Sequence, residues 1–68
     1  MSQGRVKWFN ENKGYGYIQK EDGEDVFVHF SAIEMKGYRS LPAGSFVKFE
    51  YIGGEMGPLA TRVLPMTL

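Results

Sequence analysis

The sequence predicts an all-β fold in which five short strands close into a small antiparallel barrel. Glycine and other turn residues interrupt the chain at short intervals, as they do between the strands of all-β domains. Between the turns, side chains alternate with the period of two that a strand requires. Because the edges of so small a sheet need protection, closure into a barrel is the expected arrangement. The strands are expected near residues 5–10, 15–20, 25–30, 46–52 and 59–64.

The first three strands are expected to form a meander joined by two short hairpins. Residues 11–14 include Asn12 and Gly14, which can adopt the left-handed dihedral angles of a tight loop. The second link centres on Asp22-Gly23, a dipeptide that strongly favours hairpins. These two links place the first three strands side by side.

The third link is longer and is expected to hold one helical turn. Ser31-Ala-Ile-Glu34 matches a capping box, in which the hydroxyl and the carboxylate satisfy backbone N–H groups reciprocally. Pro42 prevents a longer helix. At the other end of the chain, Pro65 should end the last strand because proline cannot donate to a ladder.

Alternation also identifies the side chains that should fill the barrel. In residues 25–30 two valines alternate with Phe27 and His29, so the valines are expected inside. The same argument and the remaining apolar positions give the expected core: Ile18, Val26, Val28, Ile33, Leu41, Val47, Phe49, Tyr51, Ala60 and Val63.

The first strand does not follow this rule clearly. Strict alternation puts Trp8 on the same face as Val6, whereas Phe9 falls on the opposite face. The pattern alone therefore leaves open which of the two rings faces outward.

The charges of the chain are balanced in number but segregated in position. Eight basic and eight acidic residues give a net charge of zero. Residues 1–20 carry a net charge of +3, and residues 21–34 carry −5. Nucleic-acid-binding domains are typically basic, so any such affinity here must come mainly from stacking rather than from phosphate neutralisation.

Length and composition indicate one small domain, covering residues 1–68. The chain has no cysteine, which excludes disulfides and fits a reducing compartment. No apolar run approaches the roughly 20 residues that span a bilayer, and the first residues lack a signal-peptide pattern. We therefore expect a cytoplasmic protein that makes no contact with a membrane.

Aromatic residues form the most informative pattern in the chain. Tyr15 and Tyr17 share one face of their strand, and Phe27 and His29 share one face of the next. If both rows lie on the same side of the sheet, they form a flat platform of exposed rings. With Lys7 nearby, such a platform suits unpaired nucleic-acid bases.

The chain resembles the cold-shock domain in three segments, taken in order: Lys7-Trp-Phe-Asn10, Lys13-Gly-Tyr-Gly-Tyr-Ile18 and Val26-Phe-Val-His-Phe30. The likeness extends over nearly the whole chain. It implies a five-stranded barrel of the OB type that binds single-stranded RNA and DNA. The implied cellular role is that of an RNA chaperone, which melts or prevents secondary structure. The likeness also implies that Trp8 faces outward, with a local bulge or strong twist in the first strand.

Binding residues are implied by the same likeness, position by position. They are Lys7, Trp8, Asn10, Lys13, Tyr15, Tyr17, Asp25, Phe27, His29, Phe30, Tyr38 and Pro58. The chain departs from the usual family pattern at Met56 and Leu59, where relatives often carry polar or basic residues. Tyrosine also replaces the commoner phenylalanine at positions 15, 17 and 38, which preserves a stacking ring and adds a hydroxyl.

The sequence favours nucleic-acid binding over other classes of function. With a single histidine and no cysteine, the chain is expected to hold no metal or other cofactor. Asp25, His29 and Ser31 lie on one local stretch without a nucleophile elbow, so we expect no catalysis and no small-molecule substrate. The remaining alternative is a protein-interaction or self-associating barrel that uses the same aromatic patch. We expect a monomer, although the long third link would allow strand exchange between two copies.

Overall fold

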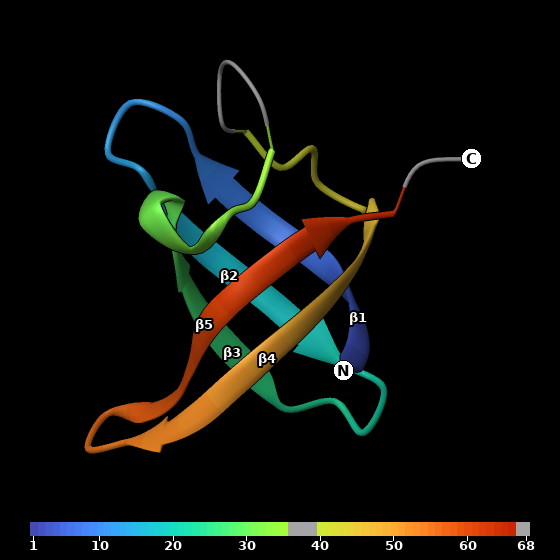
Figure 1. The fold of residues 1–68 in the computed structure, drawn as a ribbon, viewed down its shortest axis with the longest axis vertical. Coiled ribbons are helices and arrows are strands. Elements are labelled where there is room, and N and C mark those ends of the chain that lie inside the picture. The colour runs from blue at the N-terminus through green and yellow to red at the C-terminus, as the bar shows by residue number, and fades with distance from the viewer. Residues whose placement is uncertain (36–39, 67–68) are drawn as a thin grey trace.

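The structure, a computed structural model, describes residues 1–35 and 40–66. These residues form five strands and one turn of 3-10 helix, and Figure 1 shows how they are arranged. The elements are β1 (Ser2–Asn10), β2 (Tyr15–Lys20), β3 (Asp25–His29), η1 (Phe30–Ala32), β4 (Phe46–Gly54) and β5 (Gly57–Pro65). The predicted number and order of strands are confirmed, although β1, β4 and β5 extend beyond the predicted ranges. β5 ends at Pro65, as expected.

The strands close into a barrel in the order β1-β2-β3-β5-β4. In the view of Figure 1, β4 and β5 cross in front of β2 and β3. Four neighbouring pairs are antiparallel, whereas β3 and β5 run parallel. A parallel pair is unavoidable here, because alternating strand directions cannot be maintained around a closed ring of five. The predicted OB-type barrel is therefore confirmed, with one parallel pair where antiparallel pairing was expected throughout.

The core of the barrel consists mainly of aliphatic side chains. Its buried members are Val6, Ile18, Val26, Val28, Ile33, Leu41, Val47, Phe49, Ala60 and Val63. Every residue of the predicted core is buried except Tyr51, and Val6 joins them. The period of two therefore located the buried residues of β2, β3 and the first part of β4 correctly.

The prediction that Tyr51 lies in the core is wrong, because its side chain is 37% exposed. The pairing of β4 with β5 shifts register between Glu50 and Tyr51. Because Glu50 pairs with Arg62 and Tyr51 with Ala60, the extra residue of this bulge lies in β5, and alternation along β4 continues. Tyr51 remains beside Phe49, with 5.9 Å between the ring centroids, but every residue of β4 after Phe49 is exposed, so Tyr51 lies where the strand extends past the core.

A second irregularity decides the orientation of the rings in β1. The pairing of β1 with β2 shifts register between Val6 and Trp8. With this bulge, Val6 is buried while Trp8, two residues later, is 43% exposed. Phe9 is partly buried and packs against the core. The outward position of Trp8 and the bulge, both implied by the cold-shock resemblance, are confirmed.

The single helical turn is confirmed, but the capping box expected in residues 31–34 is absent. The N-cap of η1 is His29, whose side chain accepts a hydrogen bond from the Ser31 N–H. Glu34 instead pairs with Arg62 of β5. The reason is that the chain leaves the turn at once to pair with β5, where the Glu34 N–H donates to the Val63 carbonyl at 2.8 Å. Within the described residues, no helix is long and apolar enough to cross a membrane.

Strands β1 and β2 approach so closely at Gly16 that a side chain has no room there. A Cβ at this position would overlap the carbonyl oxygen of Trp8 and lie 2.7 Å from the Cα of Phe9. Both are backbone atoms that cannot rotate away. The pairing beside Trp8 therefore depends on glycine at this position.

We predict that Gly16→Ala lowers the free energy of unfolding by about 1–3 kcal/mol, the usual cost of forcing extra atoms into a packed site. Denaturant titration at equilibrium measures this loss. Gly53→Ala is the matched control, because a Cβ there meets nothing within 4 Å. An equal loss in the two variants would contradict the role assigned to the close approach.

Candidate nucleic-acid interface

Four aromatic rings lie side by side on the outer face of β1, β2 and β3. Trp8 pairs with Tyr17 across β1 and β2, and Tyr17 pairs with Phe27 across β2 and β3. Tyr15 lies two residues before Tyr17 and therefore on the same face of β2. We refer to Trp8, Tyr15, Tyr17 and Phe27 as the aromatic cluster. Directly behind it, Ile18 and its neighbours face the core.

Each ring of the aromatic cluster contacts two others. The centroid distances are 5.5 Å for Trp8–Tyr17, 5.5 Å for Tyr17–Phe27, 5.8 Å for Tyr15–Phe27 and 5.9 Å for Trp8–Tyr15. Only Tyr15 and Phe27 are stacked, with 29° between their planes, whereas the other pairs are inclined by 59–76°. The expected flat platform is therefore wrong in detail, since edge-to-face contacts suit the ring quadrupoles. The surface presents both faces and edges of rings.

The aromatic cluster is held on one side and open on the other. Trp8 is 43% exposed, and the other three rings are half-buried. Packing against the sheet and against one another fixes the rings before any ligand arrives. Little side-chain entropy is then left to lose when a flat ligand covers them.

His29 and Phe30 continue this surface beyond the end of β3. Their ring centroids are 4.6 Å apart, and Phe30 is 43% exposed. Phe30 packs over Gly14, where a Cβ would lie 2.7 Å from the ring, and its N–H donates to the Gly14 carbonyl at 2.8 Å. Gly14 takes the left-handed conformation with φ +79°, whereas Asn12, expected to share it, does not. The β1–β2 loop thus positions Phe30.

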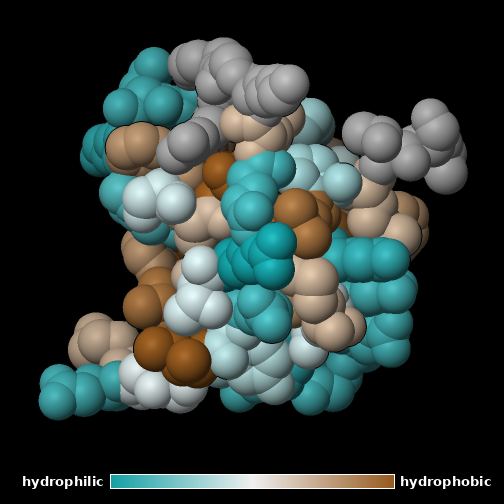
Figure 2. All heavy atoms as spheres, in the orientation of Figure 1, coloured by the Kyte–Doolittle hydropathy of each residue, from teal (hydrophilic) through white to brown (hydrophobic). Residues whose placement is uncertain are grey.

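A hollow of about 550 Å³ opens on the other side of the aromatic cluster. Tyr17 and Phe27 form one wall, and Met56, Pro58 and Leu59 form the other. Figure 2 shows hydrophobic side chains gathered at this end of the barrel, where β4 turns into β5. The structure therefore brings the predicted residue Pro58 to the aromatic cluster. Sequence reasoning noted Met56 and Leu59 only as departures from the family pattern and missed them as part of this wall.

A family model described as the 'Cold-shock' DNA-binding domain matches residues 2–66. The chain belongs to the cold-shock domain family. It is 56% identical over 64 residues to the cold shock-like protein CspC of Bacillus cereus, and the alignment covers 94% of this chain and 98% of that protein. The cold shock protein CspD of Bacillus subtilis (strain 168) is 53% identical over 66 residues, and CspB of Geobacillus stearothermophilus is 52% identical over 66 residues. Each of these two alignments covers 97% of this chain and 100% of the relative.

In this cold-shock domain the predicted contact residues Lys7 and Asp25 face each other. The Nζ of Lys7 lies 3.1 Å from Oδ2 of Asp25, and each side chain is 41% exposed. An ion pair this exposed contributes about 0–1 kcal/mol, so a phosphate can compete for the ammonium. The other oxygen of Asp25 is buried and has no hydrogen-bond partner in the described part of the chain.

Asn10 organises the loop that carries Lys13. Its Oδ1 accepts a hydrogen bond from the Lys13 N–H at 2.9 Å, and its carbonyl accepts one from the Gly14 N–H at 2.7 Å. Lys13 itself is exposed. Of the other predicted residues, Tyr38 lies outside the described part of the chain.

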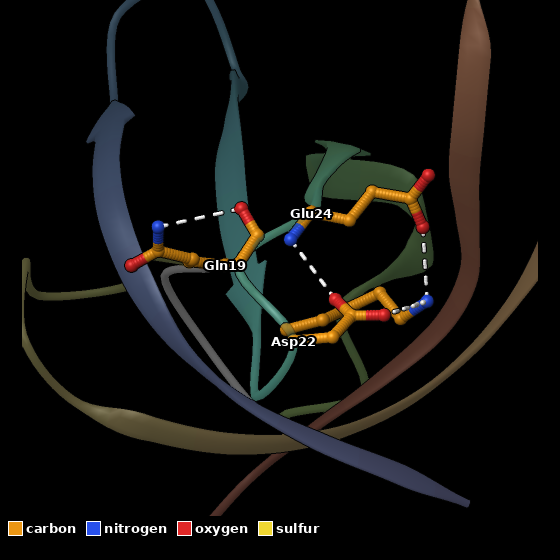
Figure 3. A network of polar contacts seen from close by, with 5 residues as sticks. Gln19, Asp22 and Glu24 are labelled. Carbon is orange, nitrogen blue, oxygen red and sulfur yellow. Dashed lines mark hydrogen bonds and ion pairs between the residues drawn. The ribbon is translucent and has the colours of Figure 1, made fainter.

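A separate group of charges occupies the β2–β3 turn (Figure 3). The Nζ of Lys20 lies 2.9 Å from Glu24 and 3.5 Å from Asp22. The pKa of Lys20 is raised above its ordinary value by contact of the ammonium with the Tyr51 side chain and then with Glu24. The pKa of Asp22 is lowered, first by the hydrogen bond from the Glu24 N–H and then by Lys20. Lys20 is thus engaged within the turn and partly neutralises its carboxylates.

The His29 ring is oriented by Ser31. Its Nδ1 accepts a hydrogen bond from the Ser31 N–H at 3.3 Å and lies 2.8 Å from the Ser31 hydroxyl. An acceptor nitrogen carries no proton, so in the neutral ring Nε2 bears the hydrogen. Among residues 1–35 and 40–66, no group of three or more His, Cys, Asp and Glu side chains is placed to hold a metal ion.

We predict that neutral His29 is the Nε2–H tautomer, with Nε2–H available as a donor toward the surface. The ¹⁵N chemical shifts of the neutral ring distinguish the two tautomers. Ser31→Ala removes the hydroxyl and should weaken this preference. A ring protonated on Nδ1 in the unmodified protein would contradict the assignment.

Proposed function

We propose that this protein binds single-stranded RNA and DNA without catalysis and acts as an RNA chaperone. The observation that carries the proposal is the aromatic cluster, in which rings from three adjacent strands are packed together and left open to solvent. Each exposed ring surface is a place where an unpaired base can stack. Membership of the cold-shock domain family supports nucleic-acid binding as the class of activity.

Stacking must supply most of the affinity, because the chain has no net charge. Base stacking on an aromatic side chain is worth roughly 1–3 kcal/mol, and it tolerates any sequence because every base has a π-face. A site of about 4–7 nucleotides suits a surface of this size. Bases in a duplex are already stacked and paired, so binding favours the open strand by mass action. This is the physical basis of the chaperone role.

We predict that Phe27→Ala weakens binding to an oligothymidine by about 1–3 kcal/mol. Phe27 contacts both Tyr15 and Tyr17, so its loss removes the centre of the stacking surface. Titration monitored by Trp8 fluorescence measures the change. Tyr51→Ala is the control, because it removes a partly exposed ring that lies outside the aromatic cluster.

The same titration tests the preference for open strands. Trp8 should respond to an unpaired strand at lower concentration than to a hairpin of equal composition. If Trp8 is indifferent to both strands and the protein instead self-associates or captures a protein partner, the aromatic cluster serves protein contact and the proposal fails.

We predict a shallow salt dependence. At roughly 0.7 per neutralised phosphate, a few contacts give a slope of log K against log salt of magnitude about 2–3. Asp25→Asn releases Lys7 from its ion pair and should increase that magnitude by about 0.7. Glu50→Gln removes the same charge from β4 and serves as the control. A magnitude above about 5 in the unmodified protein, or equal slopes in the two variants, would contradict this distribution of contacts.

A further inference from the structure

The outer face that carries the aromatic cluster continues past it along β1 and β2. On β2, Gln19 lies two residues after Tyr17 and on the same face. Across the sheet Gln19 pairs with Arg5 of β1, and Arg5 pairs in turn with Phe46 of β4. The row that contains Trp8 and Tyr17 is therefore followed by a row of Gln19, Arg5 and Phe46.

Arg5 and Phe46 form an exposed cation–π pair at the end of this row. The guanidinium carbon of Arg5 lies 4.6 Å from the centroid of the Phe46 ring. Phe46 is 54% exposed, more than Trp8 in the aromatic cluster. The pair offers a planar cation and a planar ring, and bases stack on both kinds of surface.

A shallow hollow of about 280 Å³ adjoins the pair, and its lining includes Gln3, Gln19, Arg5 and Phe46. Pockets for whole small molecules usually start near 300 Å³, so this one suits a single flat ring better than a larger ligand. The amide nitrogen of Gln19 donates a hydrogen bond to the Gly23 carbonyl, and the amide oxygen of Gln19 points away from the turn (Figure 3). That oxygen can accept a hydrogen bond from a base.

The charges around the hollow favour a base over a phosphate. Arg5 forms no ion pair among the described residues. Lys20 lines the hollow, but its ammonium is held by Glu24 and Asp22. Glu21 also lines the hollow and would repel a phosphate. A neutral aromatic ligand avoids this repulsion and still gains from the cation of Arg5.

We propose that Arg5 and Phe46 form an additional base-binding subsite, which takes one base of the same strand that covers the aromatic cluster. This inference rests on the proposed function. Arg5 lies three residues before Trp8, about 10 Å along the strand, and β4 lies one strand further, about 5 Å across the sheet. The two surfaces are thus continuous, and a strand leaving Trp8 reaches Phe46 without crossing the core or the β2–β3 turn.

The experiment compares Phe46→Leu and Phe46→Tyr with the unmodified protein, using oligothymidines from about four to about ten nucleotides. Leucine keeps an apolar side chain but removes the ring, whereas tyrosine keeps the ring. We expect Phe46→Leu to bind the longest strands at least about fivefold more weakly and the shortest strands unchanged. The affinity of Phe46→Leu should reach its plateau at strands one or two nucleotides shorter than those at which the unmodified protein reaches its own. Phe46→Tyr should match the unmodified protein at every length. Thermal unfolding of each variant confirms that the barrel is intact.

Two outcomes would overturn the subsite. The first is a Phe46→Leu variant whose affinity rises with length as in the unmodified protein. The second is a Phe46→Leu variant whose affinity depends on strand length as in the unmodified protein but whose self-association, measured by sedimentation, is altered. Phe27→Ala, measured on the same strands, separates this failure from failure of the proposed function. If Phe27→Ala weakens binding and Phe46→Leu does not, the aromatic cluster binds nucleic acid and only the additional subsite is wrong.

Discussion

The wall of this barrel has two faces, and only one of them can be buried. Aliphatic side chains such as Ile18 and Val26 fill the inner face completely. Because strand side chains alternate, the residues between them must point outward, and in β2 and β3 most of those residues are aromatic. Tyr17 and Phe27 bury part of their surface against the sheet and against neighbouring rings. The stability of the core and the exposure of the aromatic cluster are two consequences of the same alternation.

A bulge and a strand extension adjust this plan. The bulge in β1 turns Trp8 outward, although Val6 lies two residues away and is buried. At its other end, β4 extends past the core, and the ring of Tyr51 there meets the ammonium of Lys20, 4.6 Å from the centroid. The bulge adds the largest ring of the chain to the aromatic cluster, and the extension supports a charged turn at some distance from it. Bulges commonly re-aim side chains in this way.

Electrostatics limit what the surface can recognise. Lys7 is paired with Asp25, and Lys20 is held within the β2–β3 turn. Arg62 faces Glu34 and Glu50. In the proposed function, ring surface therefore supplies most of the contact with a ligand, and ring surface does not distinguish strongly between bases. That proposal assigns any preference for one base over another to residues such as His29 and Gln19, whose polar atoms lie beside the rings.

The sequence alone determined the elements, the core and most of the aromatic cluster. The period of two acts between neighbours in the chain, so it was sufficient to place Ile18 and Val28 inside and Tyr15, Tyr17 and Phe27 outside. The long-range arrangement was decided by the tertiary structure. Only closure of the barrel sets β5 beside β3, where Leu59 pairs with Phe27 and Met56 reaches the same hollow.

The remaining differences have the same origin. Tyr51 lies outside the core, contrary to prediction, because β4 extends past the interior of the barrel, and the helical turn has His29 as its cap because the chain pairs with β5 directly after Ile33. Arg5 and Phe46 are neighbours through pairing across the 40 intervening positions of the sequence, at the contact of β1 with β4. A local pattern reports which face a residue prefers. Which distant residue shares that face depends on pairing register and chain closure, which are properties of the whole barrel.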